Sequence, residues 1–277
     1  YCSITGYGQG GPLAKRAGHD LNYIALGGLL SLTGQPDGDP EVPGVPVADL
    51  AGGGLWSVIA LLAALREAEK SGRGQHLDVA LFDSCLALLA NQGQTYLATG
   101  ENPRRIGNTH PTIVPYQVFR TADGAMILAC GNDNLFGKFC AVAGCEALAK
   151  DPRFAKNGDR VKNRTSLVPM LAEIFLNRTT ADWVDTLDAA GVPCGPINTL
   201  AQAFAEPQAE ARGMKFTLPH PLAGAVPLIG SPMKFSGTPV RPELPPPTLG
   251  QHSDAILRDM LGTSAEEVAK LRAAGAI

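Results

Sequence analysis

The sequence predicts a mixed α/β protein, because short strand-like runs and longer helical runs follow one another along its 277 residues. A chain of this length can form one large domain or two smaller ones with an ample core. A polar, turn-rich stretch at residues 100–115 predicts a domain boundary. We therefore expect a large domain at residues 1–104, a small α+β domain at residues 105–205, and a C-terminal segment at residues 206–277 that returns to the large domain.

Strands and helices alternate in the first part. In order, the predicted elements are a strand at 1–5, a helical run at 17–32, a largely buried helix at 55–65, a strand at 75–82 and a helix at 83–98. A glycine-rich loop follows Gly6, and Gly27 and Gly28 interrupt the run at 17–32.

The remaining residues predict a hairpin and several short helices. In order, these are a hairpin at 116–129 with its turn at 122–124, helices at 134–142, 160–177 and 181–190, a turn-rich connector at 191–198 and a short helix at 200–205. Beyond Gly213 we expect short strands broken by prolines. Ser264 and Glu267 form a capping box that opens a last helix.

Composition argues against several kinds of partner. The net charge of −3 gives no positive field for nucleic acid or for an anionic membrane. Glycines break the apolar run at residues 50–65, so we expect no membrane span. The cysteines and histidines show neither a CxxC pair nor metal-ligand spacing. We expect reduced thiols in a cytoplasmic protein, with no metal and no permanently bound cofactor.

Residues 43–54 carry one carboxylate, Asp49, between a short extended segment and the start of a helix. Free backbone N–H groups and the helix dipole favour an anion there. An N-cap aspartate, which contributes about 1 kcal/mol, would explain Asp49 alone. It does not explain Gly52, Gly53 and Gly54, because each costs about 1 kcal/mol relative to alanine inside a helix. The glycines therefore favour a functional site slightly over a plain N-cap. If this joint faces a dry pocket, Asp49 can act as a nucleophile towards an acyl group, with glycine N–H groups stabilising an oxyanion.

Two other stretches allow both a functional and a structural interpretation. His19 can serve as a base, or it can simply cap or line a helix start, which local reasoning favours. Residues 107–110 can form a lid that excludes water from a reactive intermediate, or they can form a plain surface turn. This loop consists of Gly107, Asn108, Thr109 and His110. Arg104, just before this loop, can bind a phosphate. Together with Arg105 it forms a basic pair, and an exposed basic pair is typically only part of a solvated face.

A set of short motifs extends over essentially the whole chain. Its members are residues 3–12, 43–54, 71–78, 105–116 (RIGNTHPTIVPY), 131–136 and 191–198. Together they resemble the class III CoA-transferases, the CaiB/BaiF-like family of formyl-CoA transferase and carnitine CoA-transferase. Residues 204–208 and 245–252 are similar to the branch that transfers CoA between dicarboxylic acids such as succinate and glutarate.

The resemblance implies a Rossmann-like large domain and a smaller α+β domain, in a homodimer whose chains pass through one another as interlocked rings. It implies that the residue matching Asp49 attacks an acyl-CoA, forms a mixed anhydride and then an aspartyl-CoA thioester, and passes CoA to a small carboxylic acid. Residues 107–110 would be the lid. The residues near CoA would be Gly8, Arg16, Leu81 and Arg104.

The resemblance also bears on the N-terminus. The sequence starts Tyr1-Cys2-Ser3, without an initiator methionine or the layout of a signal peptide, and enters a strand-like run at once. Family members are longer here by about one small subdomain, which carries part of the parallel sheet and contacts to the CoA nucleotide. We therefore expect that an N-terminal portion precedes this sequence.

One stretch is more similar to a sister branch. Residues 18–23 are closer to α-methylacyl-CoA racemase, in which the residues matching His19 and Asp49 are the two bases beside the substrate α-carbon. The racemases place a supporting glutamate in the stretch matching residues 131–136, and this chain has none there. We expect a transferase, with a racemase and a non-catalytic CoA-binding protein as the alternatives.

Overall fold

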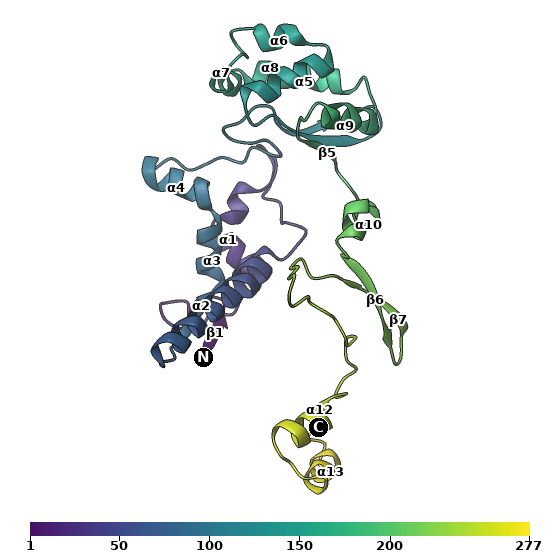
Figure 1. Ribbon diagram of the computed structural model, residues 1–277. Helices are drawn as coiled ribbons and strands as arrows, with labels where there is room; N and C mark the ends of the chain where they lie inside the picture. Colours follow the sequence, from purple (N-terminus) through teal and green to yellow (C-terminus); the bar gives the residue numbers. More distant parts are fainter. The chain divides into compact units, whose positions relative to one another are not determined.

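The computed structural model describes all residues from 1 to 277 (Figure 1). In it, strand β1 (Cys2–Thr5) lies parallel to strand β2 (Leu77–Ala80). Cys2 is opposite Leu77, and Thr5 is opposite Ala80. Parallel strands need a long crossover, and helices supply it here. Both predicted strands are confirmed, although the second is shorter than expected because helix α3 begins at Leu81.

Helices make up most of the rest of this part of the chain. They are α1 (Asp20–Leu26), η1 (Leu29–Leu32), η2 (Ala48–Leu55), α2 (Trp56–Ser71), α3 (Leu81–Leu88) and α4 (Ala90–Thr99). The predicted interruption after α1 is confirmed, since Gly28 has φ +82° and separates α1 from η1. The helix predicted at 83–98 is two helices, because Ala90 takes the positive φ of +44°. A small hydrophobic core forms where buried residues of this part pack together, namely Tyr7, Tyr23, Ile24, Ala48, Leu81 and Cys85.

Helices η2 and α2 form one continuous helix of 24 residues, Ala48–Ser71. The glycines therefore lie inside this helix and do not break it. By length and composition alone it could cross a membrane, which corrects the expectation that glycines break this apolar run. Leu55, Ile59 and Leu62 are each more than half exposed, at 64%, 55% and 62%. A core helix of a water-soluble protein passes the same test, so the helix is weak evidence for a membrane span.

A three-stranded antiparallel sheet organises residues 114–197. Its strands, in spatial order, are β3 (Tyr116–Arg120), β4 (Ala125–Ala129) and β5 (Cys194–Pro196). The predicted hairpin is confirmed, with Tyr116 opposite Ala129. The connector predicted at 191–198 instead contributes β5, a strand that its glycine and prolines conceal in the sequence.

Five helices accompany this sheet. They are α5 (Asp133–Ala143), α6 (Glu146–Lys150), α7 (Asn157–Lys162), α8 (Arg164–Phe175) and α9 (Thr180–Ala189). The single helix predicted at 160–177 is thus α7 and α8, which meet at Asn163. Phe175 is fully buried and stacks on Phe119 and Phe139 with ring centroids 4.5 and 5.5 Å apart. The sheet and helices therefore share one aromatic core.

The chain divides into two packing units, Tyr1–Ile197 and Asn198–Ile277. The second unit holds α10 (Leu200–Ala205), α11 (Pro207–Ala211), the hairpin of β6 (Lys215–His220) and β7 (Gly224–Ile229), α12 (Ser253–Ala255), η3 (Ile256–Met260) and α13 (Ala265–Ala273). The predicted capping box is confirmed, because the Ser264 hydroxyl accepts from the Glu267 N–H at 3.2 Å. The three-part domain division stays a prediction.

Candidate functional site

The carboxylate of Asp20 binds the start of helix η2. Its Oδ1 atom accepts hydrogen bonds from the backbone N–H groups of Ala48 (2.6 Å) and Asp49 (3.1 Å). Asp20 is itself the first residue of α1, so one side chain joins two helix starts that are 28 residues apart. It satisfies N–H groups that a helix start leaves free, as an N-cap residue would. The backbone position of Asp49 is thereby fixed.

Asp49 lies in the first turn of η2, and its side chain is exposed. This agrees with the predicted position near a helix start, and the dry pocket around the carboxylate stays a prediction. Its backbone N–H donates to Asp20 at the start of α1, and in these 277 residues its side chain is open to water. Eight residues of η2 are π-helical, a wide turn that is frequent at functional sites.

Two buried tyrosines lie beneath this helix start. The rings of Tyr7 and Tyr23 meet edge to face with centroids 5.1 Å apart. Burial, then Tyr7, then the negative charge of Asp49 raise the pKa of the Tyr23 phenol. The buried hydroxyl of Tyr7 has no hydrogen-bond partner.

Two of the three glycines of η2 have a packing role. A Cβ atom on Gly52 would lie 3.0 Å from the Cβ of Ser84, and one on Gly53 would lie 3.6 Å from Leu81 Cδ1. Helix α3 therefore approaches η2 closely at these positions. Interior helical N–H groups are generally used by the helix itself, so the packing gives no support to the oxyanion role, which stays a prediction.

His19 is the N-cap residue of α1 and is exposed. Its backbone N–H donates to Asn22 Oδ1 at 2.9 Å. The expected position at a helix start is therefore confirmed, and the role of His19 as a base stays a prediction. Because Asp20 follows it and binds the N–H of Asp49, the chain also brings the backbone of His19 into the neighbourhood of Asp49. No contact between the two side chains is observed.

The four residues predicted to contact CoA differ in how exposed they are. Gly8, with φ +90°, donates its N–H to Thr5 Oγ1 at 2.9 Å, and the guanidinium of Arg16 lies 5.9 Å from the ring centroid of Tyr7. Arg16 and Arg104 are exposed and available to an anion. Leu81 is buried in the core against η2, so its side chain supports the helix packing.

The loop at residues 107–110 is held by backbone contacts. Gly107, with φ +64°, donates its N–H to Gly34 O at 3.2 Å, and the Thr109 hydroxyl donates to Ile106 O at 2.8 Å. His110 donates its N–H to Tyr116 O at 2.9 Å, and the two rings lie 5.1 Å apart. Asn108 is exposed. The lid role of this loop stays a prediction.

Sequence reasoning assigned no role to Asp20 beyond its place beside His19. The signal that could have found it is an acidic residue in the first turn of a helix, directly after a glycine and a histidine. Such a residue can cap a second helix as well as its own. Its partner, 28 residues further on, is set by tertiary packing and leaves no local pattern.

Comparison with known proteins gives the family. The model of CoA-transferase family III matches residues 1–253. This chain belongs to CoA-transferase family III. It is 43% identical over 260 residues to the succinate–glutarate CoA-transferase of Agrobacterium fabrum, an alignment that covers 94% of this chain and 65% of that protein. It is 37% identical over 277 residues to the succinyl-CoA:glutarate CoA-transferase of Homo sapiens, covering 100% of this chain and 63% of that protein.

A solved structure supports the same family. The CaiB/BaiF family protein from Brucella suis superposes with a TM-score of 0.80 at 45% sequence identity, covering 94% of this chain and 67% of that one. The mixed α/β class is thereby confirmed. This family III chain spans less than two thirds of the length of the two curated relatives.

Proposed function

We propose that this protein transfers coenzyme A from an acyl-CoA thioester to a free dicarboxylic acid, with Asp49 as the covalent nucleophile. The observation that carries the proposal is the 43% identity over 260 residues to a succinate–glutarate CoA-transferase. The geometry supports it, because Asp49 presents an open carboxylate on a backbone that Asp20 holds in place. A fixed nucleophile loses less freedom when it reaches the transition state.

The reaction begins when an Asp49 carboxylate oxygen attacks the thioester carbonyl carbon. The C–S bond breaks, the CoA thiolate leaves, and a mixed anhydride remains. The thiolate then attacks the carbonyl carbon of Asp49, which releases the donor acid and leaves an aspartyl-CoA thioester. The acceptor carboxylate attacks this thioester to give a second anhydride, and the thiolate takes the acceptor acyl group. Asp49 returns as a carboxylate, and no water or redox partner is consumed.

Water must be kept from these intermediates, although Asp49 is exposed in this chain. We propose that the active protein covers Asp49 with parts that lie outside these 277 residues, in an interlocked homodimer. The loop of residues 107–110 would act as the lid. Cover is required because a mixed anhydride hydrolyses readily in an open site.

For CoA itself, we propose contacts through exposed cationic groups. Arg16 and Arg104 would meet phosphates, and the loop at Gly8 would lie along the pantetheine arm. Leu81 would contribute only through the packing beneath η2. We place this activity in the cytoplasm, with no metal and no permanently bound cofactor.

The experiment that tests the function follows product masses. Full-length protein is incubated with succinyl-CoA and glutarate, and the transferase predicts glutaryl-CoA in proportion to the succinate released. A racemase would instead exchange the α-proton of a 2-methylacyl-CoA in deuterated water without an acceptor acid, and His19→Ala would abolish that exchange. A CoA-binding protein without catalytic activity would give neither product. Either of these results would refute the transferase proposal.

A further inference from the structure

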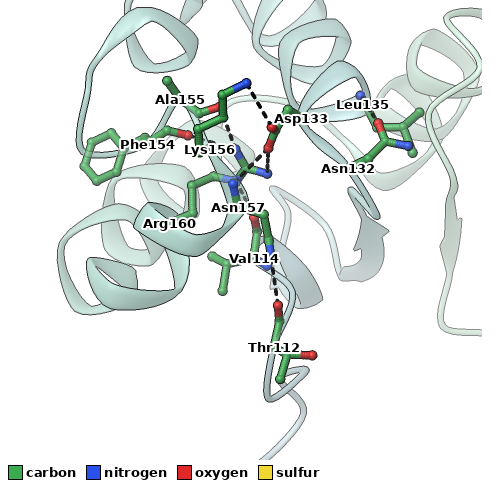
Figure 2. Close-up of polar contacts among 10 residues, drawn as sticks. All are labelled: Thr112, Val114, Asn132, Asp133, Leu135, Phe154, Ala155, Lys156, Asn157 and Arg160. Atoms are coloured by element: carbon green, nitrogen blue, oxygen red, sulfur yellow. Dashed lines mark hydrogen bonds and ion pairs between the residues drawn. The ribbon is translucent and has the colours of Figure 1, made fainter.

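A fully buried arginine lies at the centre of a polar network beside the proposed lid (Figure 2). The Nε of Arg160 donates to Val114 O at 2.6 Å, and its Nη1 donates to Phe154 O at 2.8 Å. Its Nη2 donates to Asp133 Oδ1 at 3.0 Å. A buried guanidinium is stable only when paired and hydrogen-bonded, and Arg160 meets both conditions. The backbone carbonyl of Val114 is therefore held from within the core.

Asn157, at the start of α7, binds the same segment with both atoms of its amide (Figure 2). Its Nδ2 donates to Thr112 O at 2.8 Å, and its Oδ1 accepts from Val114 N–H at 3.1 Å. Two bonds from one planar group to the backbone of residues 112–114 fix the direction of the chain as well as its position.

Arg164, at the start of α8, adds a third anchor one step earlier in the loop. Its Nη2 donates to His110 O at 3.2 Å and to Pro111 O at 2.8 Å. Asn157, Arg160 and Arg164 thus hold the backbone from residue 110 to residue 114. All three side chains come from one stretch of eight residues, 157–164.

The loop is tied at its other end to a separate segment. Gly107 donates its N–H to Gly34 O at 3.2 Å, and Arg105 donates to Gln35 O at 3.3 Å and Gly38 O. The backbone on each side of residues 107–110 is therefore hydrogen-bonded to another segment of the chain. One segment is the loop at residues 34–38, and the other is the start of α7 and α8.

We infer that Asn157 and Arg160 are positioning residues for the lid, because they fix residues 112–114 and so set where residues 107–110 lie. The inference rests on the proposed transferase function. Neither residue touches the reacting groups. Their effect is on how well the lid keeps water from the anhydride and from the aspartyl thioester, and so on whether the donor acyl-CoA ends as product or as free CoA.

The test compares Asn157→Ala with Lys156→Ala in the full-length protein. Lys156 is the neighbouring residue, its side chain is 76% exposed, and its Nζ lies 3.5 Å from Asp133 Oδ2. Succinyl-CoA and glutarate are supplied together, and the ratio of hydrolysis to transfer is measured. This ratio is independent of the fraction of enzyme that is folded, so a purely structural role would leave it unchanged.

We expect Asn157→Ala to raise the hydrolysis-to-transfer ratio about tenfold, in keeping with the loss of two hydrogen bonds. Asn157→Asp keeps the acceptor for the Val114 N–H and should give an intermediate ratio. Lys156→Ala should match the wild type. If the ratio in Asn157→Ala equals that of the wild type, the inference is overturned. If the alanine variant does not fold, an unchanged ratio in Asn157→Asp overturns it. A wild-type protein without transfer would refute the proposed function instead.

Discussion

Asp20 Oδ1 lies 3.1 Å from the backbone nitrogen of Asp49 and 2.6 Å from that of Ala48, so one carboxylate fixes the helix start that carries the proposed nucleophile. An acceptor at this place stabilises the positive end of the helix. The Asp49 side chain remains free to react because the backbone, and not the carboxylate, is held.

Replacing Asp20 tests this relationship. Asp20→Ala removes the acceptor and should lower the free energy of unfolding by about 1–2 kcal/mol, the range for a lost cap or charged hydrogen bond. Asp20→Asn keeps an acceptor oxygen and should lose less. Urea unfolding of both variants measures the difference. Asp37→Ala, in an exposed loop, is the control. Equal stability of Asp20→Ala and wild type would contradict the role of this carboxylate.

The glycines of η2 give a second prediction. Alanine substitutions at the adjacent positions 52 and 53 should change the stability of the protein in opposite directions. Gly52→Ala places a Cβ 3.0 Å from Ser84 Cβ, and such overpacking should destabilise the protein by about 1–3 kcal/mol. Gly53→Ala meets Leu81 Cδ1 at an ordinary 3.6 Å and should gain up to about 1 kcal/mol in helix propensity. Thermal unfolding of the two variants, compared with the wild type, measures both stability changes. If Gly52→Ala proved the more stable variant, the close packing of η2 on α3 would be refuted.

The ion pair of Asp133 predicts a pH dependence. Burial alone would raise the pKa of Asp133, but hydrogen bonds from Arg160 and from the Asn157 N–H, with the charges of Arg160 and Lys156, outweigh it and hold the pKa below its ordinary value. A lowered folded-state pKa contributes stability above the unfolded pKa of about 4, and this stability is lost as the pH falls through the folded pKa.

The variant Asp133→Asn isolates this contribution. The stability difference between wild type and variant should be constant above about pH 5 and should shrink as the pH drops below about 4. Other carboxylates titrate alike in both proteins, so they cancel in the difference. Denaturant unfolding from pH 3 to pH 7 measures it. A difference that does not change with pH would show that Asp133 titrates normally.

Local patterns predicted much of the fold. The hairpin at 116–129 was predicted, and Asp49 was expected beside a helix start, although the helix begins at Ala48 and not at residue 55. Other features depend on tertiary packing. Gly52 and Gly53 stay helical because α3 packs against them, and a rule based on helix propensity reads them as a break.

The site itself was only partly predictable. Asp49 could be singled out because a carboxylate beside three glycines is unusual, whereas Asp20 and Asn157 act on backbone that lies 28 and 43 residues away. A single sequence contains no sign of such distant pairings. The exposure of Asp49 was likewise beyond a local pattern, because it depends on which elements cover the helix start.

The most direct test of the central claim is the mass of the protein after reaction with an acyl-CoA. Full-length protein is mixed with succinyl-CoA without an acceptor acid, quenched in acid and digested. The transferase mechanism predicts a hydroxylamine-sensitive adduct on the peptide that contains Asp49, absent in Asp49→Asn. An adduct on another residue, or an active enzyme with Asp49→Asn, would refute Asp49 as the covalent nucleophile.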